Sequence, residues 1–447
     1  MGTKEKKAWY FIGNLKGDKV IWSILLLLML LSLLFVFSST IKKGEGASLA
    51  TIMDQVRTVI FGIVAVIIVY NLPMNWIQFL SRWGFLFSVA SLIALFAFGE
   101  DVNESVRYIK IGSLQVHVLE MVKVAILMYI AWVADAFEKK KVLFFDKLVR
   151  KIPKLQKPIY RKLFYLYIPF ITTVVMVMKS SNTTAMFLAL IMMITIGIVT
   201  KEYKTLLTLA AVLFSAVAIM FGIYQGSVSR GDNPPACRRI GTAISRIVSV
   251  NDVKNFKEAT NPAERYRALD KIRQPYSARI AIHQGKFLGK GPGQSTQKYV
   301  VPIMAEDYMF SFIIEEYGWL LSLFVLALYL SLVARGQLVI RSCGTNTFAI
   351  ATIFGLVLLI SGQAFIHIFV NMDFGLLTGQ TLPMLSHGSF AFLCFSVAFG
   401  IILNISKVAA KGMEKMKKDE TPIMAPSGSD SSDEVRESLE DLDNYDL

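Results

Sequence analysis

The chain has 447 residues, of which 54% are hydrophobic and 18% charged, and its mean hydropathy is +0.52. This composition is too apolar for an ordinary soluble protein. Its three cysteines, Cys237, Cys343 and Cys394, lie far apart, which excludes a disulfide scaffold and a cysteine-based metal site. The net charge of +14 is not accompanied by an aromatic RNA-binding module or a zinc finger, so nucleic-acid binding is excluded as well.

Apolar runs close to the length that crosses a bilayer recur through most of the chain. They predict an all-α polytopic membrane protein with about ten transmembrane helices and one large extracytoplasmic loop. The expected spans lie near residues 20–38, 57–72, 82–98, 116–136, 162–178, 183–199, 205–224, 308–333, 347–370 and 386–405.

These spans divide the chain into membrane and non-membrane parts. The parts are an N-terminal segment 1–19, transmembrane helices 1 to 7 within 20–224, a loop 225–306, transmembrane helices 8 to 10 within 307–405, and a tail 406–447. The tail is acidic from Asp419 onward, with ten acids and one base, and has almost no aromatic residues. Such a composition cannot bury a core, so we expect this tail to be solvated and disordered.

Lysines and arginines are concentrated in alternate connections between the expected spans. The 139–162 connection alone carries ten bases, and further bases precede the first span and follow the last. Cytoplasmic loops hold this excess, so both termini are expected in the cytoplasm and loop 225–306 outside. Long loops cross the membrane whatever their charge, and the bases of this loop therefore do not change the orientation.

Ionisable side chains inside spans are costly and mark candidate functional positions. Glu120 and Lys123 lie three residues apart on one face of the fourth span, where they could serve catalysis or simply neutralise each other and lock helix packing. Glu315 and Glu316 lie in the eighth span. They could face neighbouring helices, but two adjacent helical carboxylates cannot point the same way, so at least one of them needs a partner.

The ninth span carries a polar stripe of Gln363, His367 and Asn371, spaced four residues apart. Stripes of this kind commonly hydrogen-bond neighbouring helices, and a catalytic set is the rarer use. The four histidines of the chain are scattered and lack the carboxylate spacing of a zinc site.

Asp307 is distinguished by its position at the membrane surface, where the large loop re-enters at the depth of Glu120 and Lys123. These three ionisable groups could converge. Just upstream, the glycine-rich run 289–298 permits close backbone approach to an anionic ligand. This run lacks the spacing of a nucleotide-binding P-loop.

Motifs along the whole membrane body resemble one family in the same order. They are Asn103, Arg107, Ile109 and Gly112; Glu120 and Lys123; Gly289-Lys290-Gly291-Pro292-Gly293 with Gln297-Lys298; Pro302, Asp307, Phe310 and Glu315-Glu316-Tyr317-Gly318; Gln363-Ala364; and Gly379, Thr381-Leu382-Pro383, Ser386 and Gly388-Ser389. This set resembles the SEDS family of FtsW, RodA and SpoVE, ten-span proteins that polymerise peptidoglycan glycan strands from lipid II. The resemblance implies a glycosyltransferase with lipid II as both donor and acceptor.

The resemblance also implies roles for particular residues. Asp307 is expected to be the general base for the acceptor 4-hydroxyl, with Lys123 and Glu120 holding and tuning the catalytic centre. The expected substrate-binding residues are Arg107, Lys298, Gly291, Gly293 and Gln297. Cations such as Arg107 and Lys298 suit contacts to phosphate. A divalent cation, Mg²⁺ or Mn²⁺, could share that task, although the sequence shows no dedicated ligand set.

The same resemblance implies partners and a location. A class B penicillin-binding transpeptidase and other divisome or elongasome membrane proteins are the expected partners, in the bacterial cytoplasmic (inner) membrane. Small residues let helices approach closely, so Gly355, Ser361 and Gly362 are expected to receive the partner's single span. The polar N-terminal extension and long acidic tail favour the division-type FtsW over the elongation-type RodA.

The chain departs from the usual family pattern at several positions. Val106 replaces the first of two arginines, Val118 and Leu119 replace a Pro-Ser pair before the glutamate, and His387 replaces a tyrosine. Two other functions also fit buried ionisable groups. A flippase of lipid-linked sugars would predict an internal repeat, which the two halves do not show, and a non-catalytic scaffold would not need carboxylates and glycines gathered at one leaflet.

Overall fold

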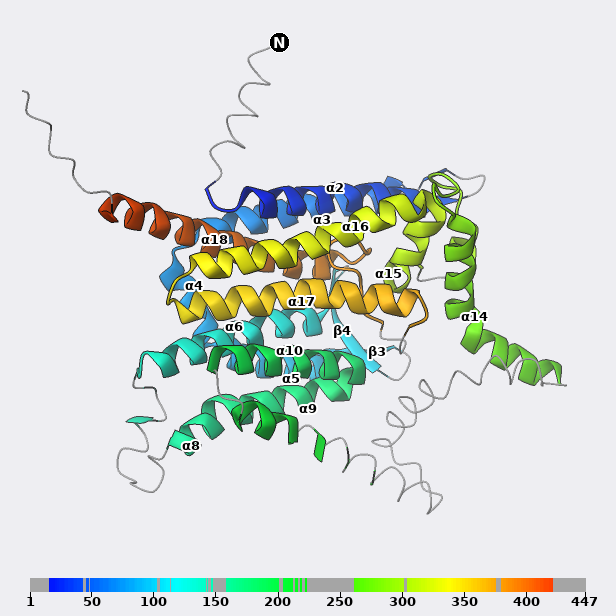
Figure 1. Ribbon diagram of the computed structural model, residues 1–447. Coiled ribbons are helices and arrows are strands. Elements are labelled where there is room, and N and C mark those ends of the chain that lie inside the picture. Colours follow the sequence, from blue (N-terminus) through cyan, green and yellow to red (C-terminus); the bar gives the residue numbers. More distant parts are fainter. Residues whose placement is uncertain are drawn as a thin grey trace, which may run out of the picture.

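The computed structural model shows long helices running side by side in one bundle (Figure 1). It describes residues 16–42, 46–47, 49–102, 105–112, 114–141, 143, 146–147, 158–200, 204–211, 214–215, 218, 222, 261–300, 304–374 and 379–420. Much of the seventh expected span, most of the first half of the large loop and the acidic tail therefore lie outside the described residues.

Helices account for most of the described elements. They are α2 (Lys19–Thr40), α3 (Leu49–Asn71), α4 (Met74–Arg82), α5 (Gly84–Phe98), α6 (Val118–Glu138), α8 (Pro158–Lys162), the π-helix η3 (Leu163–Tyr167), α9 (Ile168–Ser180), α10 (Asn182–Thr200), α14 (Pro262–Gly285), the 3₁₀ turn η5 (Gln297–Tyr299), α15 (Met304–Asp307), α16 (Met309–Ser342), α17 (Thr347–Asn371) and α18 (Ser389–Glu420).

Six of the described helical segments are long and apolar enough to cross a membrane, or seven if the bent pair α4 and α5 is one span. The chain is thus a polytopic membrane protein built from helices, as the apolar runs predict. Two of the expected spans do not meet this criterion among the described residues: α6 carries several charged side chains, and the apolar part of α10 covers only 182–198. By length and composition, the described helices therefore do not reach the expected ten spans.

Two expected boundaries are wrong for identifiable reasons. The third expected span, 82–98, is only the second arm of a helix pair that bends by 53° at Trp83. The second helix begins at Leu49 rather than near residue 57, because polar residues interrupt the apolar pattern without ending the helix. One of them, Gln55, is buried and donates to the Ser32 hydroxyl of α2 at 2.8 Å.

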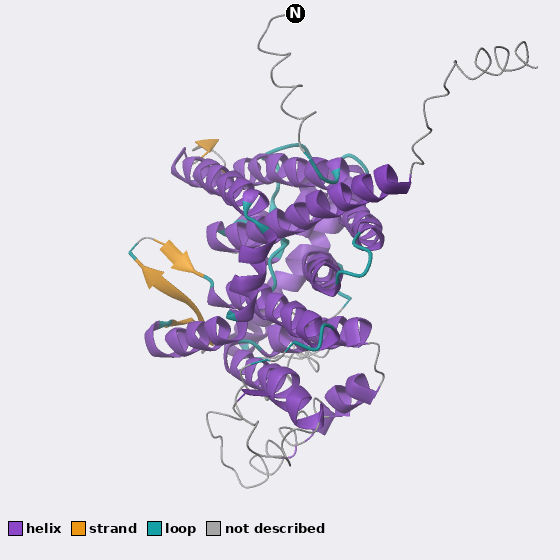
Figure 2. Cartoon of the chain, turned by 90° about the vertical axis from the view of Figure 1, so that its left-hand side faces the viewer, coloured by secondary structure: helices purple, strands orange, loops and turns teal. Residues whose placement is uncertain are grey.

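Short strands occur where the sequence predicts only loops. A two-stranded hairpin joins β1 (Ile41–Lys42) to β2 (Gly46–Ala47), and β3 (Glu100–Val102), β4 (Ser105–Ile111) and β5 (Leu114–Val116) form a three-stranded antiparallel sheet. The larger sheet connects α5 to α6 and extends from the side of the bundle (Figure 2).

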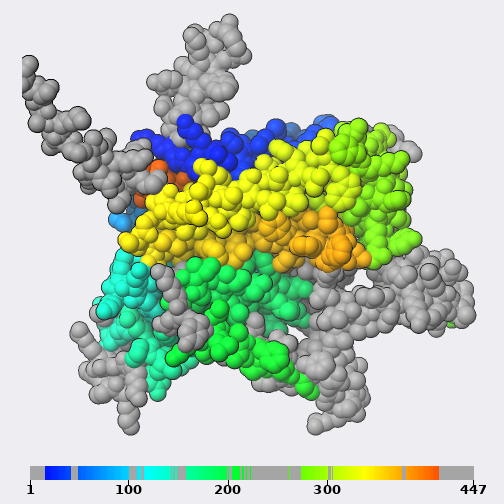
Figure 3. Space-filling model, viewed as in Figure 1, coloured from blue at the N-terminus to red at the C-terminus, as the bar shows by residue number. Residues whose placement is uncertain are grey.

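Close helix packing depends on small residues at the crossings. A Cβ atom at Gly84 of α5 would lie 2.3 Å from the Ala125 carbonyl oxygen of α6, so only glycine permits this approach. In Figure 3, α16 and α17 cross the middle of the visible face between α2 and α10, and α14 covers one end. Apolar side chains such as Leu320, Leu323 and Leu330 are exposed along α16, as expected for contact with lipid.

The two ends of the bundle carry different elements. The described chain ends, before α2 and at the end of α18, lie at one end, whereas α14, α15 and the β3–β5 sheet lie at the other (Figure 1). At the first end, Asp18 caps α2 and pairs with Arg335 of α16 at 3.0 Å. Asn404 of α18 donates to the carbonyl oxygens of Val69, Tyr70 and Leu72, which end α3.

Candidate functional site

A buried lysine lies in the second turn of α6. Lys123 is fully buried, and its ammonium contacts Glu120 Oε1 at 2.7 Å, Gln363 Oε1 at 2.6 Å and Gln380 Oε1 at 3.2 Å. Glu120 keeps 13% of its side chain exposed. A buried cation needs an opposite charge and filled donors, and these three oxygens supply both. We call these four residues the lysine cluster.

The lysine cluster connects elements that are distant in sequence. Gln363 of α17 donates to the Thr381 carbonyl at 3.0 Å, and Gln380 donates to the Thr184 hydroxyl of α10 at 2.6 Å. His367 Nδ1 lies 2.7 Å from the Gln380 carbonyl oxygen. The stripe on α17 therefore joins α6 to the 379–388 segment by side-chain hydrogen bonds, and Gln380 links that segment to α10.

Asp307 ends the short helix α15, one residue before α16 begins. Asn371 of α17 donates to the Asp307 carbonyl oxygen at 3.2 Å, and the Ser386 hydroxyl donates to the Glu306 carbonyl oxygen at 2.9 Å. The backbone of this acidic pair is thus held from two sides, by α17 and by the 379–388 segment. The Asp307 side chain is half-buried.

The neighbouring Glu306 carboxyl is electrostatically unusual. Its side chain keeps exposed surface, yet the surrounding protein removes part of its hydration and Asp307 adds a second negative charge. Burial, followed by repulsion from Asp307, raises the pKa of Glu306 to about 7. Near neutral pH this acidic pair therefore gains or loses a charge.

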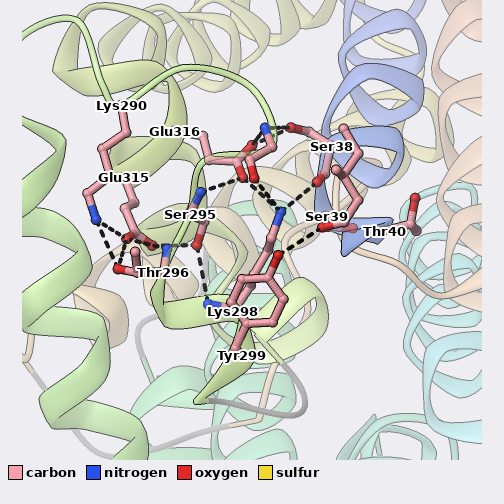
Figure 4. A network of polar contacts seen from close by, with 12 residues as sticks. Ser38, Ser39, Thr40, Lys290, Ser295, Thr296, Lys298, Tyr299, Glu315 and Glu316 are labelled. Carbon is pink, nitrogen blue, oxygen red and sulfur yellow. Dashed lines mark hydrogen bonds and ion pairs between the residues drawn. The ribbon is translucent and has the colours of Figure 1, made fainter. Parts of the chain in front are cut away.

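A second set of buried charges lies where the glycine-rich loop 289–298 wraps around α16 (Figure 4). The Glu315 carboxylate accepts from Lys290 Nζ at 2.7 Å, from the Thr296 backbone N–H at 2.9 Å, and from the Ser295 hydroxyl at 2.5 Å. The Thr296 hydroxyl adds a further donor at 2.9 Å. Glu315 is fully buried and fully satisfied.

The same loop also binds Glu316. Its carboxylate accepts from the backbone N–H groups of Gly293 at 3.0 Å and Ser295 at 3.1 Å, and from the Ser38 hydroxyl at the end of α2. Lys298 Nζ lies 3.4 Å from the carboxylate and also donates to the Gly293 carbonyl oxygen. We call the two glutamates and this loop the glutamate cluster.

Two glycines allow the loop to lie against α16. Gly318 interrupts α16 with φ +78°, and a Cβ there would lie 2.2 Å from the Phe287 carbonyl oxygen. A Cβ at Gly289, also at φ +78°, would lie 2.3 Å from the Glu316 carbonyl oxygen. Both positions require positive φ and close backbone contact, which only glycine provides.

Comparison with known proteins identifies the family of the chain. The model of the FtsW/RodA/SpoVE family, described as cell cycle protein, matches residues 18–411. The chain belongs to this family. A probable peptidoglycan glycosyltransferase FtsW of Bacillus subtilis (strain 168) is 27% identical over 77% of this chain and 76% of its own length. One of Hahella chejuensis (strain KCTC 2396) is 24% identical over 90% and 93%.

Solved structures show the same fold. A chain from a study of how a peptidoglycan synthase complex coordinates polymerisation and crosslinking has a TM-score of 0.59 at 16% identity, covering 88% of this chain and 98% of its own. The rod shape determining protein RodA of Thermus thermophilus has a TM-score of 0.54 at 15% identity, with 88% and 98% covered. The FtsW/RodA/SpoVE fold therefore extends over nearly all of the matched region.

Within this family member, the structure brings some expected site residues together and separates others. Glu120 and Lys123 are paired, and Asp307 is tied through Asn371 to the same face of α17 that holds Lys123. Arg107 lies in β4, and its side chain is outside the described residues.

The glycine-rich loop differs most from expectation. Lys298 was expected to lie outside and contact phosphate, but its side chain is only 6% exposed because it neutralises Glu316. The backbone N–H groups of Gly291, Gly293 and Gln297 likewise point to oxygens of Glu315 or Glu316. The anion that this loop binds in the structure is thus part of the protein itself.

Glu315 and Glu316 point to different partners, as adjacent helical residues must, but these partners are mostly not on neighbouring helices. The glycine-rich loop curves around α16 and supplies most of them for both carboxylates. One further expectation is wrong. Gly355 and Gly362 do not form an outward face for a partner helix. Gly355 packs against α6 and α10, and Gly362 packs against Phe187 of α10.

The diverged motif positions have mixed surroundings. Val118 is buried and Leu119 packs against the core, so both apolar side chains are accommodated by apolar surroundings. Burial lowers the pKa of His387, and the nearby Asp54 carboxylate partly offsets this effect. The side chain of Val106 is outside the described residues.

Sequence reasoning did not identify several residues that build the site. Gln380 and Thr184 complete the polar contacts around Lys123, and Ser38 completes those around Glu316. Ser386 was noted only as a motif residue, and its hydroxyl binds the Glu306 carbonyl oxygen. Each is a polar residue at a helix end or in a short loop, where such residues are common. In the part of the chain that the structure describes, no three His, Cys, Asp or Glu side chains gather as metal ligands.

Proposed function

We propose that this protein is a peptidoglycan glycosyltransferase that polymerises lipid II during bacterial cell division or elongation. The observation that carries the proposal is the restrained Asp307 segment, whose backbone is fixed by α17 beside the face that binds Lys123. The names of the FtsW relatives support the same activity.

In this mechanism Asp307 is the general base. Its carboxylate accepts the proton of the acceptor 4-hydroxyl while that oxygen attacks the anomeric carbon of the donor sugar. A new carbon–oxygen bond forms, and the bond from the anomeric carbon to the pyrophosphate oxygen breaks with its electron pair. The leaving group is undecaprenyl pyrophosphate, and the glycan grows by one disaccharide unit.

The lysine cluster is proposed to support this step. Glu120 and Lys123 form a pair whose charges cancel, so the buried ammonium is compensated before the substrate binds. Because Glu120 is partly exposed, the pair can respond to a bound substrate. Both residues are proposed members of the catalytic centre.

The substrate pyrophosphate is proposed to meet Arg107 of β4 and the outer surface of the glycine-rich loop. Gly291 has no neighbour within 3.9 Å of the position that a Cβ would take, which leaves room for a ligand beside Gly293 and Gln297. Lys298 can contribute only if phosphate replaces Glu316 as its partner. A divalent cation carried by the pyrophosphate is part of the proposal, and no step above depends on it.

The reaction is assigned to the outer face of the bacterial cytoplasmic membrane, with both termini in the cytoplasm. The basic loops support this orientation, and both described chain ends lie at the end of the bundle opposite α15, the helix that ends at Asp307 (Figure 1). A class B transpeptidase is the proposed partner, because a structural relative belongs to a synthase complex that couples polymerisation to crosslinking. Co-purification with the class B transpeptidases of the source organism tests this assignment.

The decisive experiment uses purified protein with fluorescent lipid II. Wild type is expected to give ladders of glycan products, and Asp307→Asn is expected to lose roughly 10²–10⁴-fold in rate while still binding lipid II. Glu306→Gln, whose side chain lies about 100° around the helix, should retain much of the activity. Near-normal ladders from Asp307→Asn would contradict the proposed base, and vesicle translocation without ladders would indicate a flippase.

A further inference from the structure

The start of α16 has no cap from its own residues. Tyr308 precedes the helix and makes no side-chain cap hydrogen bond, and the first backbone bond within the helix runs from Phe312 N–H to the Tyr308 carbonyl oxygen at 3.1 Å. The N–H groups of Phe310 and Ser311 therefore have no acceptor in their own helix. Both residues are buried, so these N–H groups need partners from elsewhere.

Helix α17 supplies both partners. His367 Nε2 accepts from the Phe310 N–H at 3.3 Å. Asn371 Oδ1 accepts from the Ser311 N–H at 2.9 Å and from the Ser311 hydroxyl at 2.8 Å. These two side chains, one turn apart on α17, thus perform for α16 the function that an N-cap residue performs within one helix.

Asn371 also binds the backbone just before α16. Its amide Nδ2 donates to the Asp307 carbonyl oxygen at 3.2 Å and to the His367 carbonyl oxygen at 2.8 Å. One buried amide therefore holds the residue before Tyr308 and the third residue after it. Because Asp307 and Ser311 are bound to the same Asn371 side chain, α17 fixes the backbone at Asp307. It thereby fixes the direction in which the Asp307 side chain projects.

The second side chain links this cap to the lysine cluster. Because His367 Nε2 accepts a hydrogen bond, the ring proton lies on Nδ1, which donates to the Gln380 carbonyl oxygen at 2.7 Å. The Gln380 side chain in turn accepts from Lys123. A continuous path of hydrogen bonds therefore joins Lys123 to the start of α16.

We infer that Asn371 is a positioning residue for Asp307, acting through the cap that it and His367 build on α16. The inference rests on the proposed function, in which Asp307 is the general base. Asn371 contacts the Asp307 backbone and the Ser311 backbone and side chain, so it affects the reaction through the placement of the carboxylate. A base displaced by about 1 Å can lose roughly 100-fold in rate.

The test compares two variants of Asn371 with a matched control. Asn371→Ala removes both sides of the contact, and Asn371→Asp keeps the shape and the acceptor but removes the donor to Asp307. Asn404→Ala removes an equally buried asparagine that also binds the backbone of another helix, at the opposite end of the bundle. The readouts are kcat and KM with lipid II, lipid II binding, and the unfolding midpoint in detergent.

We expect both Asn371 variants to lose roughly 10- to 100-fold in kcat, with KM and lipid II binding close to wild type. Asn404→Ala should lower the unfolding midpoint by a similar amount to Asn371→Ala and leave kcat within a factor of about two, because its cap is distant from the base. Should Asn371→Ala not be recovered folded, the isosteric Asn371→Asp decides the question.

Wild-type kcat in the Asn371 variants would overturn the inference, and so would an equal kcat loss in Asn404→Ala, since the loss would then follow stability alone. Asp307→Asn is measured in parallel. If Asp307→Asn is inactive while the Asn371 variants are active, only the positioning role fails. If Asp307→Asn polymerises lipid II normally, the proposed base itself fails.

Discussion

The lysine cluster and the glutamate cluster are both sets of buried charge, but they are satisfied in different ways. Lys123 depends on three side-chain oxygens from α6, α17 and the loop before α18, and its counter-ion Glu120 is partly exposed. Glu315 and Glu316 are fully buried and receive backbone N–H groups, hydroxyls and two lysines, nearly all from one loop. The first set can rearrange by rotating side chains, whereas the second cannot change without moving backbone.

Under the proposed function, this difference separates the catalytic centre from a structural anchor. A buried carboxylate whose acceptors are filled by fixed backbone donors holds two segments together and has no remaining capacity for a ligand. A buried ammonium held by flexible side chains can exchange one oxygen for another when a substrate arrives. We therefore assign the glutamate cluster to fixing the outer loop on α16 and the lysine cluster to the chemistry.

The largest expected effect on stability tests the anchor. Glu316→Gln keeps the size of the side chain but leaves Lys298 without its counter-charge and places an amide NH₂ near the N–H groups of Gly293 and Ser295. Breaking one half of a buried pair costs about 3–5 kcal/mol. We expect a clearly lower unfolding midpoint in detergent, measured by intrinsic fluorescence.

The control for this prediction removes the stranded cation as well. Lys298→Met combined with Glu316→Gln should recover part of the lost stability, because the uncompensated charge is gone. If the single Glu316 variant unfolds at the wild-type temperature, the glutamate cluster is not an anchor and the contrast between the clusters disappears.

The next effect concerns activity rather than stability. Lys123→Met removes the cation, while Gln363 and Gln380 keep their second hydrogen bonds to Thr381 and Thr184. The polymerisation rate is expected to fall about 100-fold, as for the loss of one electrostatic contact at a reaction centre. Glycan ladders and the unfolding midpoint are measured on the same preparation. A midpoint as low as that of Glu316→Gln would show that Lys123 is also an anchor.

A smaller effect is expected at the edge of the anchor. Thr296 is exposed, and its hydroxyl donates to Glu315 and accepts from Lys290. Thr296→Val removes these contacts but keeps the backbone bond from Thr296 to Glu315. We expect a loss of about 0.5–1.5 kcal/mol in stability with lipid II polymerisation unchanged. A strong loss of polymerisation without a change in stability would instead assign the Thr296 hydroxyl to substrate binding.

Much of the fold could be predicted from the sequence because membrane spans are encoded locally. An apolar run of about 20 residues has few alternatives to a helix in lipid, and α2, α10 and α17 lie close to the expected ranges. The bend between α4 and α5 could not be predicted, since α4 has a polar face and does not form an apolar run. The β3–β5 sheet depends on pairing between short segments with little individual signal.

The site was only partly predictable, because its charges are matched by tertiary contacts. Spacing on one helix predicts that Glu120 and Lys123 meet, and they do. No sequence pattern predicts that Gln380 completes the lysine cluster. Nor does one predict that the glycine-rich loop binds Glu315 and Glu316 rather than an external anion. Those contacts depend on how the loop folds back over α16, which adjacent residues do not encode.

The smallest expected effect concerns Glu306, an acidic residue that belongs to neither cluster. Its pKa of about 7 in the folded protein lies above the ordinary value of 4.5, so the folded state binds this proton more tightly than the unfolded chain. The stabilisation from this proton is complete below pH 4.5 and is lost as the pH rises through 7. Glu306→Gln imitates the protonated form, so the variant should unfold at a higher temperature than wild type at pH 8.

This difference should shrink toward pH 5, where wild-type Glu306 is itself protonated. Unfolding midpoints of both proteins at pH 5, 6, 7 and 8 in one detergent provide the measurement. Glu315→Gln is the contrasting variant. It replaces a carboxylate oxygen that accepts hydrogen bonds from Lys290 or Ser295, so it should destabilise the protein at each of these pH values. A Glu306→Gln difference that does not depend on pH would mean that repulsion within the acidic pair does not control this carboxyl. The pair would then contribute to the site only through its hydrogen-bonded backbone.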